Sequence, residues 1–277
     1  MADQKIAVVT GATSGIGQYI ALGLARAGYC AVLVARNPAR AETTQRWIAE
    51  RAPGAVTELM LADLSSLEAT RSIGRAIAAR HPRIDVLVNN AGLVTPKRQV
   101  TPEGHEMILA VNHLSPFVLT DVLEFALKAA APARVVNVGS TASDRARIDL
   151  DDLEGERKWN ALSAYGRSKL AIMMATFDRA QRLHGTGVAV NVVHPGVVAT
   201  RIGSIPGPIG LMWRLGAPFM LTPEQGADTP LYVALSPHAE GITGRYFKKR
   251  KEARPNPQAL DPALVERLWS ETVRLAG

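Results

Sequence analysis

An apolar run that leads without a break into a glycine-rich turn constrains this chain most. Residues 5–10 read Lys-Ile-Ala-Val-Val-Thr, a continuous run typical of a strand buried in a parallel sheet. The turn follows at once, and a helical pattern then extends to about residue 27. Glycines in this context let the backbone approach a pyrophosphate, and the N-terminus of the next helix favours its charge. We therefore predict a dinucleotide site, with an empty tight turn as the alternative. Its predicted residues are Gly11, Thr13, Ser14, Gly15, Ile16 and Gly17.

The strand-and-helix unit repeats along the rest of the chain. Further strands are expected at 31–35, 56–61, 85–88, 134–138, 188–193 and 245–247. Helices are expected at 39–52, from Ser65 or Ser66 to Arg80, at 103–130 with a break near Ser115-Pro116, around Tyr165 to about Leu183, at 222–236 and at 262–276. Such alternation predicts an α/β fold with a Rossmann-type doubly wound parallel sheet. Because no linker interrupts the 277 residues, we expect one domain over 1–277.

Composition and charge exclude several classes of protein. Hydrophobic residues make up 47% and charged residues 21%, which is ordinary for a globular chain. The net charge is +7, but the basic residues are scattered apart from 248–251 and aromatic residues are only 5%, so we expect no nucleic-acid partner. The single cysteine, Cys30, excludes an internal disulfide and is expected to be a packing residue, while His113 has no second histidine at ligand spacing, so no metal site is expected. Without a signal peptide or a run of 18 apolar residues, we expect no transmembrane segment and a cytoplasmic location.

Two charged residues at strand ends bear on the choice of cofactor. Arg36 ends the strand at 31–35, where an acidic residue would bind the ribose of NAD, and a cation there suits the 2′-phosphate of NADP. Arg40 is nearby, and a solvated arginine at a strand end is the alternative. Asp63 follows the strand at 56–61 and either accepts a hydrogen bond from adenine or caps the next helix. We therefore predict NADP(H) as the cofactor, with NAD as the less favoured choice.

Small and polar residues follow the strand at 85–88, as Asn89-Asn90-Ala91-Gly92. The carboxyl ends of strands are where open α/β sheets bind ligands, so Asn89, Ala91 and Gly92 are cofactor candidates. Asn112 lies in the middle of the next helix, four residues before Pro116. A proline there frees backbone groups, which makes Asn112 a candidate for holding a water, or an ordinary polar residue at a kink.

Ser140, Tyr165 and Lys169 form the candidate catalytic group. Tyr165 and Lys169 are four positions apart on a predicted helix and therefore share a face. A phenol with a pKa near 10 exchanges protons poorly at neutral pH, and a neighbouring cation would lower that pKa. We therefore expect Tyr165 to act as a general acid or base, with Ser140 hydrogen-bonded to a carbonyl oxygen. A chance pairing at helical spacing is the alternative.

Two segments do not fit the strand-and-helix pattern. Residues 144–159 are polar, and we interpret them as a solvated excursion beside the site. Residues 201–221 are apolar but broken by prolines and glycines. We interpret them as a mobile lid over an apolar substrate, with interface packing and a membrane-surface contact left open.

Taken together, these motifs resemble the short-chain dehydrogenase/reductases, and within them the retinol-dehydrogenase-like branch. The resemblance covers nearly the whole chain. The features that indicate that branch are the long gap between Ser140 and Tyr165 and the tail, Thr243-Gly244-Arg245-Tyr246-Phe247 and Pro257-Gln258-Ala259-Leu260. The other motifs of the resemblance are Thr10-Gly11-x-x-x-Gly15-x-Gly17, Asp63-Leu64, Asn89-Asn90-Ala91-Gly92, Asn112, Ser140, Tyr165-x-x-x-Lys169 and His194-Pro195-Gly196.

The resemblance implies a role for each site residue. Tyr165 would be the general acid in reduction, Lys169 would lower its pKa and hold the nicotinamide ribose, and Ser140 would orient the substrate oxygen. Asn112 would support a water that relays protons to Lys169. Pro195, Gly196, Val198 and Thr200 would lie along the nicotinamide, and Asp63-Leu64 beside the adenine.

The expected activity is hydride transfer between NADP(H) and the carbonyl or hydroxyl carbon of a lipophilic small molecule. The alternatives are an NAD-dependent alcohol dehydrogenase of the same fold and a non-catalytic NADP-sensing regulator, which would be expected to lose the Tyr/Lys pair. Relatives of this kind commonly form homodimers or homotetramers.

Overall fold

The apolar runs of the sequence form one eight-stranded sheet in the computed structural model, which describes residues 4–198 and 220–277. The strands follow the order β3-β2-β1-β4-β5-β6-β7-β8, and all neighbours pair in parallel except β7 and β8. The predicted doubly wound sheet is therefore confirmed. The strands are β1 (Ile6–Thr10), β2 (Cys30–Ala35), β3 (Thr57–Leu61), β4 (Val86–Asn89), β5 (Ala133–Val138), β6 (Val188–His194), β7 (Tyr246–Lys248) and β8 (Lys251–Glu252).

The order of the strands reverses at β1, which pairs with β2 on one side and β4 on the other. A crevice opens at such a reversal because the loops after the two strands turn to opposite faces of the sheet. The glycine turn follows β1, and 90–92 follow β4, so the two predicted ligand-binding loops meet at this point.

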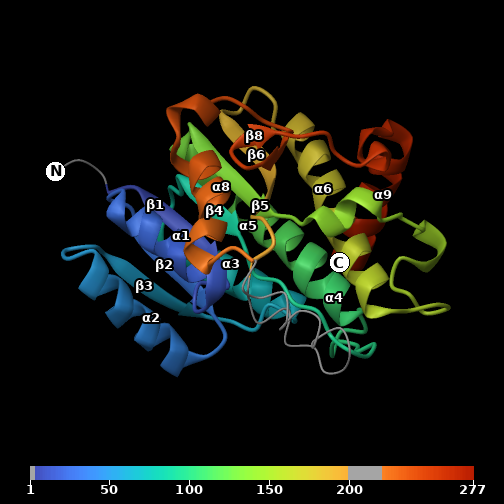
Figure 1. Ribbon diagram of the computed structural model, residues 1–277, viewed down its shortest axis with the longest axis horizontal. Helices are drawn as coiled ribbons and strands as arrows, with labels where there is room; N and C mark the ends of the chain where they lie inside the picture. Colours follow the sequence, from blue (N-terminus) through green and yellow to red (C-terminus); the bar gives the residue numbers. More distant parts are fainter. Residues whose placement is uncertain (1–3, 199–219) are drawn as a thin grey trace.

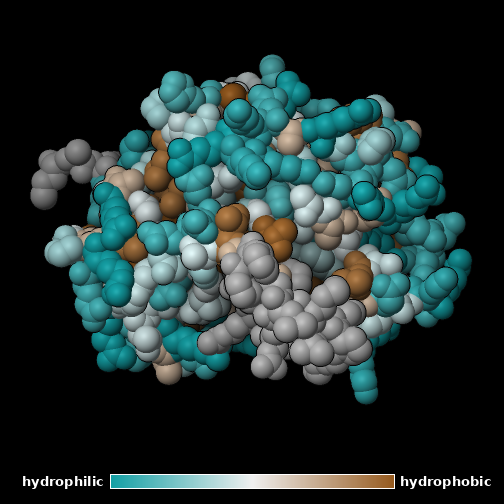
Figure 2. Space-filling view, viewed as in Figure 1, coloured by the Kyte–Doolittle hydropathy of each residue, from teal (hydrophilic) through white to brown (hydrophobic). Residues whose placement is uncertain are grey.

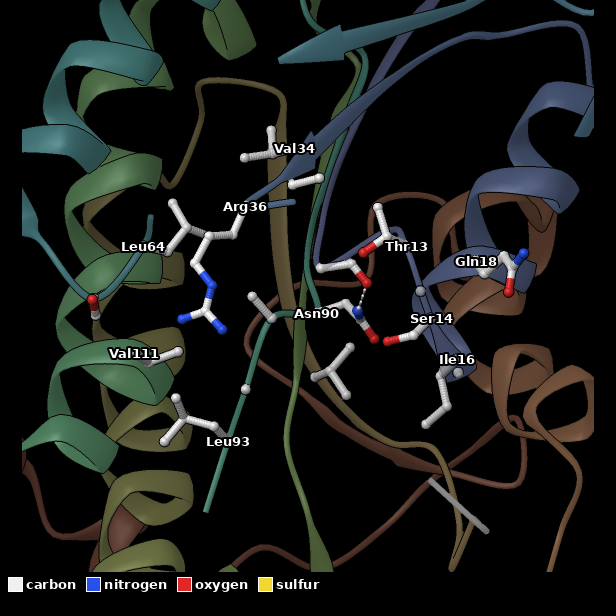
Figure 3. A pocket seen from close by; sticks show the side chains of 18 of the residues that line it. Thr13, Ser14, Ile16, Gln18, Val34, Arg36, Leu64, Asn90, Leu93 and Val111 are labelled. Carbon is white, nitrogen blue, oxygen red and sulfur yellow. Dashed lines mark hydrogen bonds between the residues drawn. The ribbon is translucent and has the colours of Figure 1, made fainter. Parts of the chain in front are cut away.

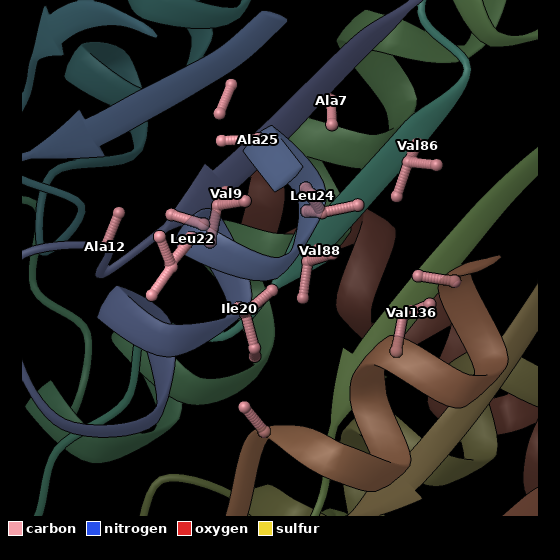
Figure 4. Close-up of a cluster of buried hydrophobic side chains, with 14 of the residues drawn as sticks. Ala7, Val9, Ala12, Ile20, Leu22, Leu24, Ala25, Val86, Val88 and Val136 are labelled. Carbon is pink, nitrogen blue, oxygen red and sulfur yellow. The ribbon is translucent and has the colours of Figure 1, made fainter. Parts of the chain in front are cut away.

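Helices cover both faces of the sheet (Figure 1). One face packs against α1 (Gly15–Arg26), α2 (Pro38–Arg51) and α8 (Pro223–Leu235), and Figure 4 shows Ile20 and Leu24 of α1 directed at valines of β1 and β4. The other face packs against α3 (Leu67–Arg80), α5 (Ser115–Ala130) and α6 (Ala161–Arg182). Burial of these apolar side chains on two faces explains why the strand sequences do not alternate between polar and apolar residues.

The C-terminal helix α9 (Pro262–Ala276) packs on α6 and forms an outer layer. Trp269 of α9 lies edge-on to Phe117 of α5, with ring centroids 4.8 Å apart. The guanidinium of Arg179 lies 4.8 Å from both ring centroids and is buried, which joins the three helices. The face of α6 that points away from the sheet is thereby covered by the tail of the same chain.

The helix predicted over 103–130 begins later than expected and is distorted at a different place. It starts with α4 (Met107–Leu109), where the carboxylate of Glu106 accepts a hydrogen bond from the Leu109 N–H at 2.8 Å. A π-helical turn, η1 (Ala110–Leu114), precedes α5, so the irregularity lies before Pro116, at Asn112. Met107–Ala130 is long and apolar enough to cross a membrane, but 72% of its most apolar window is buried inside the protein.

The structure corrects the interpretation of residues 144–159, adds a strand that was not predicted and confirms the prediction for Cys30. Residues 144–159 are not simply solvated, because Ile148 and Leu153 are buried in the cluster beneath α6. Strand β8 was not predicted; it has only two residues and none of the apolar character of the other strands. Cys30 is a buried packing residue, as predicted, and burial raises the pKa of its thiol to about 11.

The face seen in Figure 2 is largely hydrophilic, with apolar side chains in small groups. The predicted lid at 201–221 falls almost wholly within 199–219, which lie outside the described residues.

Candidate active site

A cleft of about 700 Å³ opens at the carboxyl ends of the central strands (Figure 3). Every residue predicted from the glycine turn lines it. The other predicted residues that line it are Arg36, Asp63, Leu64, Ala91, Gly92, Tyr165, Lys169 and Pro195. Residues from six separate segments of the chain are thus brought together by the fold.

The glycine turn needs glycine at defined positions. Gly11 and Gly15 have φ angles of 63° and 56°, a region that side chains other than glycine rarely occupy. A Cβ at Gly17 would lie 2.4 Å from the Gly11 carbonyl oxygen and from the Asn90 side-chain nitrogen. The backbone at Gly17 therefore packs directly against Gly11, the first residue of the turn, which brings the start of α1 close to the end of β1.

Asn90 and Thr10 pin this turn to the loop after β4. The Asn90 amide donates to the carbonyls of Thr10 and Gly11 at 2.9 and 3.3 Å. The Thr10 hydroxyl accepts from the backbone N–H groups of Asn90 and Ala91, both at 3.0 Å. Neither residue was predicted to have this role. The motif around them was visible in the sequence, but a contact between residues 80 positions apart was not.

The turn has the properties that a dinucleotide phosphate requires. Ser14 is the N-cap of α1, yet its side chain makes no capping hydrogen bond, and no acidic residue occupies the first turn of the helix. The first N–H groups of α1 therefore have no capping side chain and lie on the wall of the cleft. Free N–H groups and a positive helix end suit an anion, so the residues present fit the pyrophosphate of a dinucleotide.

Arg36 and Asp63 face each other at the end of the cleft next to β2 and β3. Their side chains are 3.5 Å apart, and Figure 3 shows the Arg36 guanidinium pointing into the cleft. Asp63 also accepts hydrogen bonds from the Ser65 N–H and hydroxyl at 3.0 and 2.8 Å. Partial burial raises the pKa of Asp63, but these bonds and the charge of Arg36 outweigh it, so the net pKa is lowered. Ser66 is the N-cap of α3, which assigns the capping role to serine and leaves Asp63 in the preceding turn.

Tyr165 and Ser140 approach each other across the junction of β5 and α6. Ser140 is the N-cap of the short helix η2 (Thr141–Arg145), and its Oγ accepts from the Ala142 N–H at 3.2 Å. Burial raises the pKa of Tyr165, and a hydrogen bond with the Ser140 side chain lowers it by less, so the net shift is upward. The phenol is therefore protonated at neutral pH.

Lys169 does not lower the pKa of Tyr165 in the way predicted. Its ammonium lies 5.8 Å from the centre of the Tyr165 ring and donates to the Val138 carbonyl at 2.8 Å. Lys169 is only 4% exposed, and burial lowers its own pKa to about 8. Desolvation thus dominates both residues, pushing the phenol and the ammonium toward their neutral forms.

Asn112 uses its amide group to join three parts of the site. Its Oδ1 accepts from the Leu93 N–H at 2.8 Å, and its Nδ2 donates to the Leu93 carbonyl and the Ser168 hydroxyl at 3.0 and 3.1 Å. A Cβ at Gly92 would lie 3.3 Å from the Asn112 oxygen and 3.4 Å from the Lys169 nitrogen. Asn112, Gly92 and Lys169 therefore meet at one end of the cleft, through the π-helical turn.

Three other predicted cofactor-binding residues in the described part of the chain do not line the cleft: Asn89, Gly196 and Val198. Asn89 does not face the cleft: its buried side chain donates to Asn137 at 2.8 Å and to Thr120 at 3.0 Å, which makes it a core link between β4, β5 and α5. Gly196 has a φ of 93°, and the Leu221 side chain occupies the space that a Cβ there would need. Val198 is buried and pairs with Leu221, whereas Thr200 lies outside the described residues.

A polar cluster beside the site was missed by sequence reasoning. The buried Glu106 accepts from the Trp159 ring N–H at 3.2 Å, and Glu154 accepts from the Glu106 N–H at 2.6 Å. His105 lies 3.2 Å from Glu154. These contacts fasten 144–159 to the start of α4, and Glu154, one of the acidic residues that suggested solvation, is hydrogen-bonded within the protein.

Known proteins share this sequence pattern and fold. The model of the short chain dehydrogenase family matches residues 5–204. Retinol dehydrogenase 13 of Homo sapiens is 38% identical over 280 residues, which cover 99% of this chain and 85% of that protein. Retinol dehydrogenase 14 of Homo sapiens is 39% identical over 290 residues, covering 99% and 86%. The crystal structure of a metagenomic short-chain oxidoreductase in complex with NADP has a TM-score of 0.67 and 27% identity, covering 91% of this chain and 97% of that one.

Proposed function

The chain belongs to the short-chain dehydrogenase family and is an oxidoreductase of retinol-dehydrogenase-like type, and from this premise we propose that it uses NADP(H) to interconvert a carbonyl and a hydroxyl group on a lipophilic small molecule. The observation that carries the proposal is the pair Arg36 and Arg40 at the adenine end of the same cleft that holds Tyr165 and Lys169. No carboxylate occurs between residues 33 and 40 to bind a bare ribose diol.

The dinucleotide, when bound, supplies or accepts the hydride. The glycine turn and the free N–H groups of α1 would hold its pyrophosphate, and Arg36 would pair with the 2′-phosphate. Gly92, Lys169 and Pro195 also line the cleft and would lie beside the nicotinamide half.

Tyr165 supplies the proton in the direction of reduction. Its raised pKa keeps the phenol protonated, so it donates to the carbonyl oxygen as negative charge develops there. The Ser140 hydroxyl, which is hydrogen-bonded to Tyr165 in the absence of substrate, is placed to donate to the same substrate oxygen. Lys169, with a pKa of about 8, replaces the proton on Tyr165 through a water that Asn112 would support.

Apolar side chains support a lipophilic substrate. Leu93, Val94 and Val111 line the cleft beside Gly92, and Val197 and Leu221 are exposed beyond Pro195. The names of the relatives make retinol and retinal the first compounds to try. The cytoplasmic location and a homodimer or homotetramer also stay proposals, to be tested by cell fractionation and by sedimentation.

Turnover of NADPH and NADH against all-trans-retinal and a panel of simpler aldehydes and ketones tests the proposal. We expect NADPH oxidation with apolar aldehydes. Faster turnover with NADH would favour the NAD-dependent alternative, and tight NADPH binding without any turnover would favour a regulator.

A further inference from the structure

The tail segment that follows β8 contacts the turn that carries Ser140. Asn256 is 5% exposed, and its amide nitrogen donates to three carbonyls of that turn, at 2.8 Å (Ser143), 3.3 Å (Asp144) and 2.9 Å (Ala146). An amide has two hydrogens, so one of them is shared between two acceptors. One buried side chain thereby hydrogen-bonds three carbonyls of this turn.

A second hydrogen-bond step connects this contact to Ser140. Ser143 is fully buried, and its N–H and hydroxyl both donate to the Ser140 carbonyl, at 3.0 and 2.6 Å. The Ser143 carbonyl in turn accepts from Asn256. The path from the tail to Ser140 therefore consists of two residues, Asn256 and Ser143, with every step hydrogen-bonded.

The turn is also packed against the residue next to Tyr165. A Cβ at Gly166 would lie 3.0 Å from the Ala142 carbonyl oxygen and 3.3 Å from the Ala146 side chain. Glycine at this position lets the turn rest directly on α6. A shift of the turn therefore changes the spacing between Ser140 and Tyr165 rather than being absorbed by a flexible side chain.

Other contacts of the tail keep Asn256 in place. Its Oδ1 accepts from the Gln258 N–H at 2.9 Å and caps the short helix η7 (Pro257–Leu260). Gln258 accepts from the Ile148 N–H at 2.9 Å, and the Lys248 ammonium donates to Asp144 at 2.7 Å. Residues 256–260 do not line the cleft, and these contacts connect them to the segment that follows Ser140.

We infer that Asn256 is a positioning residue for the reaction: it holds Ser140 beside Tyr165, where the Ser140 hydroxyl orients the substrate oxygen that Tyr165 protonates. The inference rests on the proposed function, because the benefit of placing Ser140 is catalytic. Misplacing a hydrogen-bonding group by about 1 Å reduces rates strongly, up to about 10²-fold.

Two substitutions of Asn256 separate its donor role from its capping role. Asn256→Asp keeps an acceptor for the Gln258 N–H but replaces the donating NH₂ with a second oxygen, and Asn256→Ser is a neutral variant that also keeps a cap. Asn191→Asp is the matched control, because Asn191 is equally buried and donates to the Ile242 carbonyl and accepts from the Arg245 N–H, away from Ser140.

The first measurement is hydrogen–deuterium exchange of the full-length protein, which requires no substrate. We expect the amides of Ala142, Ser143 and Ala146 to exchange at least ~10-fold faster in either Asn256 variant than in wild type, as expected when a buried hydrogen bond is lost. They should be unchanged in Asn191→Asp. Unchanged exchange in both Asn256 variants would overturn the inference. If one variant does not fold, the other decides.

The second measurement is a double-mutant cycle with Ser140→Ala, using NADPH with all-trans-retinal, or with 4-nitrobenzaldehyde where retinal is not turned over. Asn256→Asp should reduce kcat about 10-fold in the Ser140 background and hardly at all in the Ser140→Ala background, because it acts through Ser140. Equal losses in both backgrounds would contradict a positioning role. Absence of turnover of either aldehyde by wild type would instead count against the proposed function, and the exchange measurement would still decide the role of Asn256.

Discussion

Replacing Arg36 with alanine should weaken NADPH binding about tenfold and leave NADH binding nearly unchanged. The Arg36 guanidinium reaches from the end of β2 into the cleft, at the end where the adenine ribose would lie. A hydrogen bond to a charged group contributes roughly 1.5–3 kcal/mol. Because the Arg36 side chain is 72% exposed and already shares its charge with Asp63, we take the lower end, about 1.5 kcal/mol, which is about a factor of ten in affinity.

Cofactor fluorescence titration of both nucleotides on each protein measures this effect. Arg75→Ala is the matched control, since Arg75 is 61% exposed, pairs with Glu68 and lies on α3 outside the cleft. Asp63→Asn should tighten NADPH, because it removes a negative charge beside the 2′-phosphate and frees Arg36. Tighter binding of NADH by wild type, or equal weakening of both cofactors by Arg36→Ala, would refute the assignment of Arg36.

Two further predictions follow from burial at the site. Burial lowers the pKa of Lys169 from 10.5 in the unfolded chain to about 8 in the folded protein. Below pH 8 the buried ammonium therefore destabilises the folded state. This destabilisation disappears as the pH rises from about 8 to 10.5, because the folded protein then holds Lys169 in its neutral form. Wild type should therefore gain up to about 3 kcal/mol of unfolding free energy relative to Lys169→Met over that pH range, measured by urea titration, and a pH-independent difference would contradict it. Gly17→Ala should abolish NADPH binding and lower the free energy of unfolding by about 1–3 kcal/mol, because the added Cβ meets the fixed Gly11 carbonyl. Gly23→Ala on the same helix is the control. Its Cβ meets only the movable Leu231 side chain, so this variant should bind NADPH normally in the same titration.

The sequence predicted those parts of the molecule that depend on local pattern. Apolar runs located seven of the eight strands, and the glycine turn and the Tyr165/Lys169 spacing each belong to one short segment. The eighth strand, β8, has two charged residues and is held by pairing with β7, so no apolar run marks it.

The features that were missed depend on contacts between distant segments. Asn256 meets the Ser140 turn across 110 to 113 positions, and Asn90 meets the glycine turn across 79 to 80. The acidic residue Glu154 looked solvated because its partners, His105 and the Glu106 N–H, are nearly 50 positions away. The pKa of Tyr165 was predicted in the wrong direction, because i, i+4 spacing shows which groups are neighbours but not how deeply both are buried.

The central claim is that Tyr165 donates the proton when a carbonyl is reduced in this cleft, and turnover by Tyr165→Phe tests it most directly. The substitution removes only the hydroxyl, so NADPH affinity and the melting temperature, measured on the same preparation, should stay close to wild type. Turnover of NADPH with all-trans-retinal, or with the best aldehyde of the panel, should fall at least ~10²-fold, the usual scale for a general acid. Near-normal turnover by a folded, NADPH-binding Tyr165→Phe protein would contradict the mechanism.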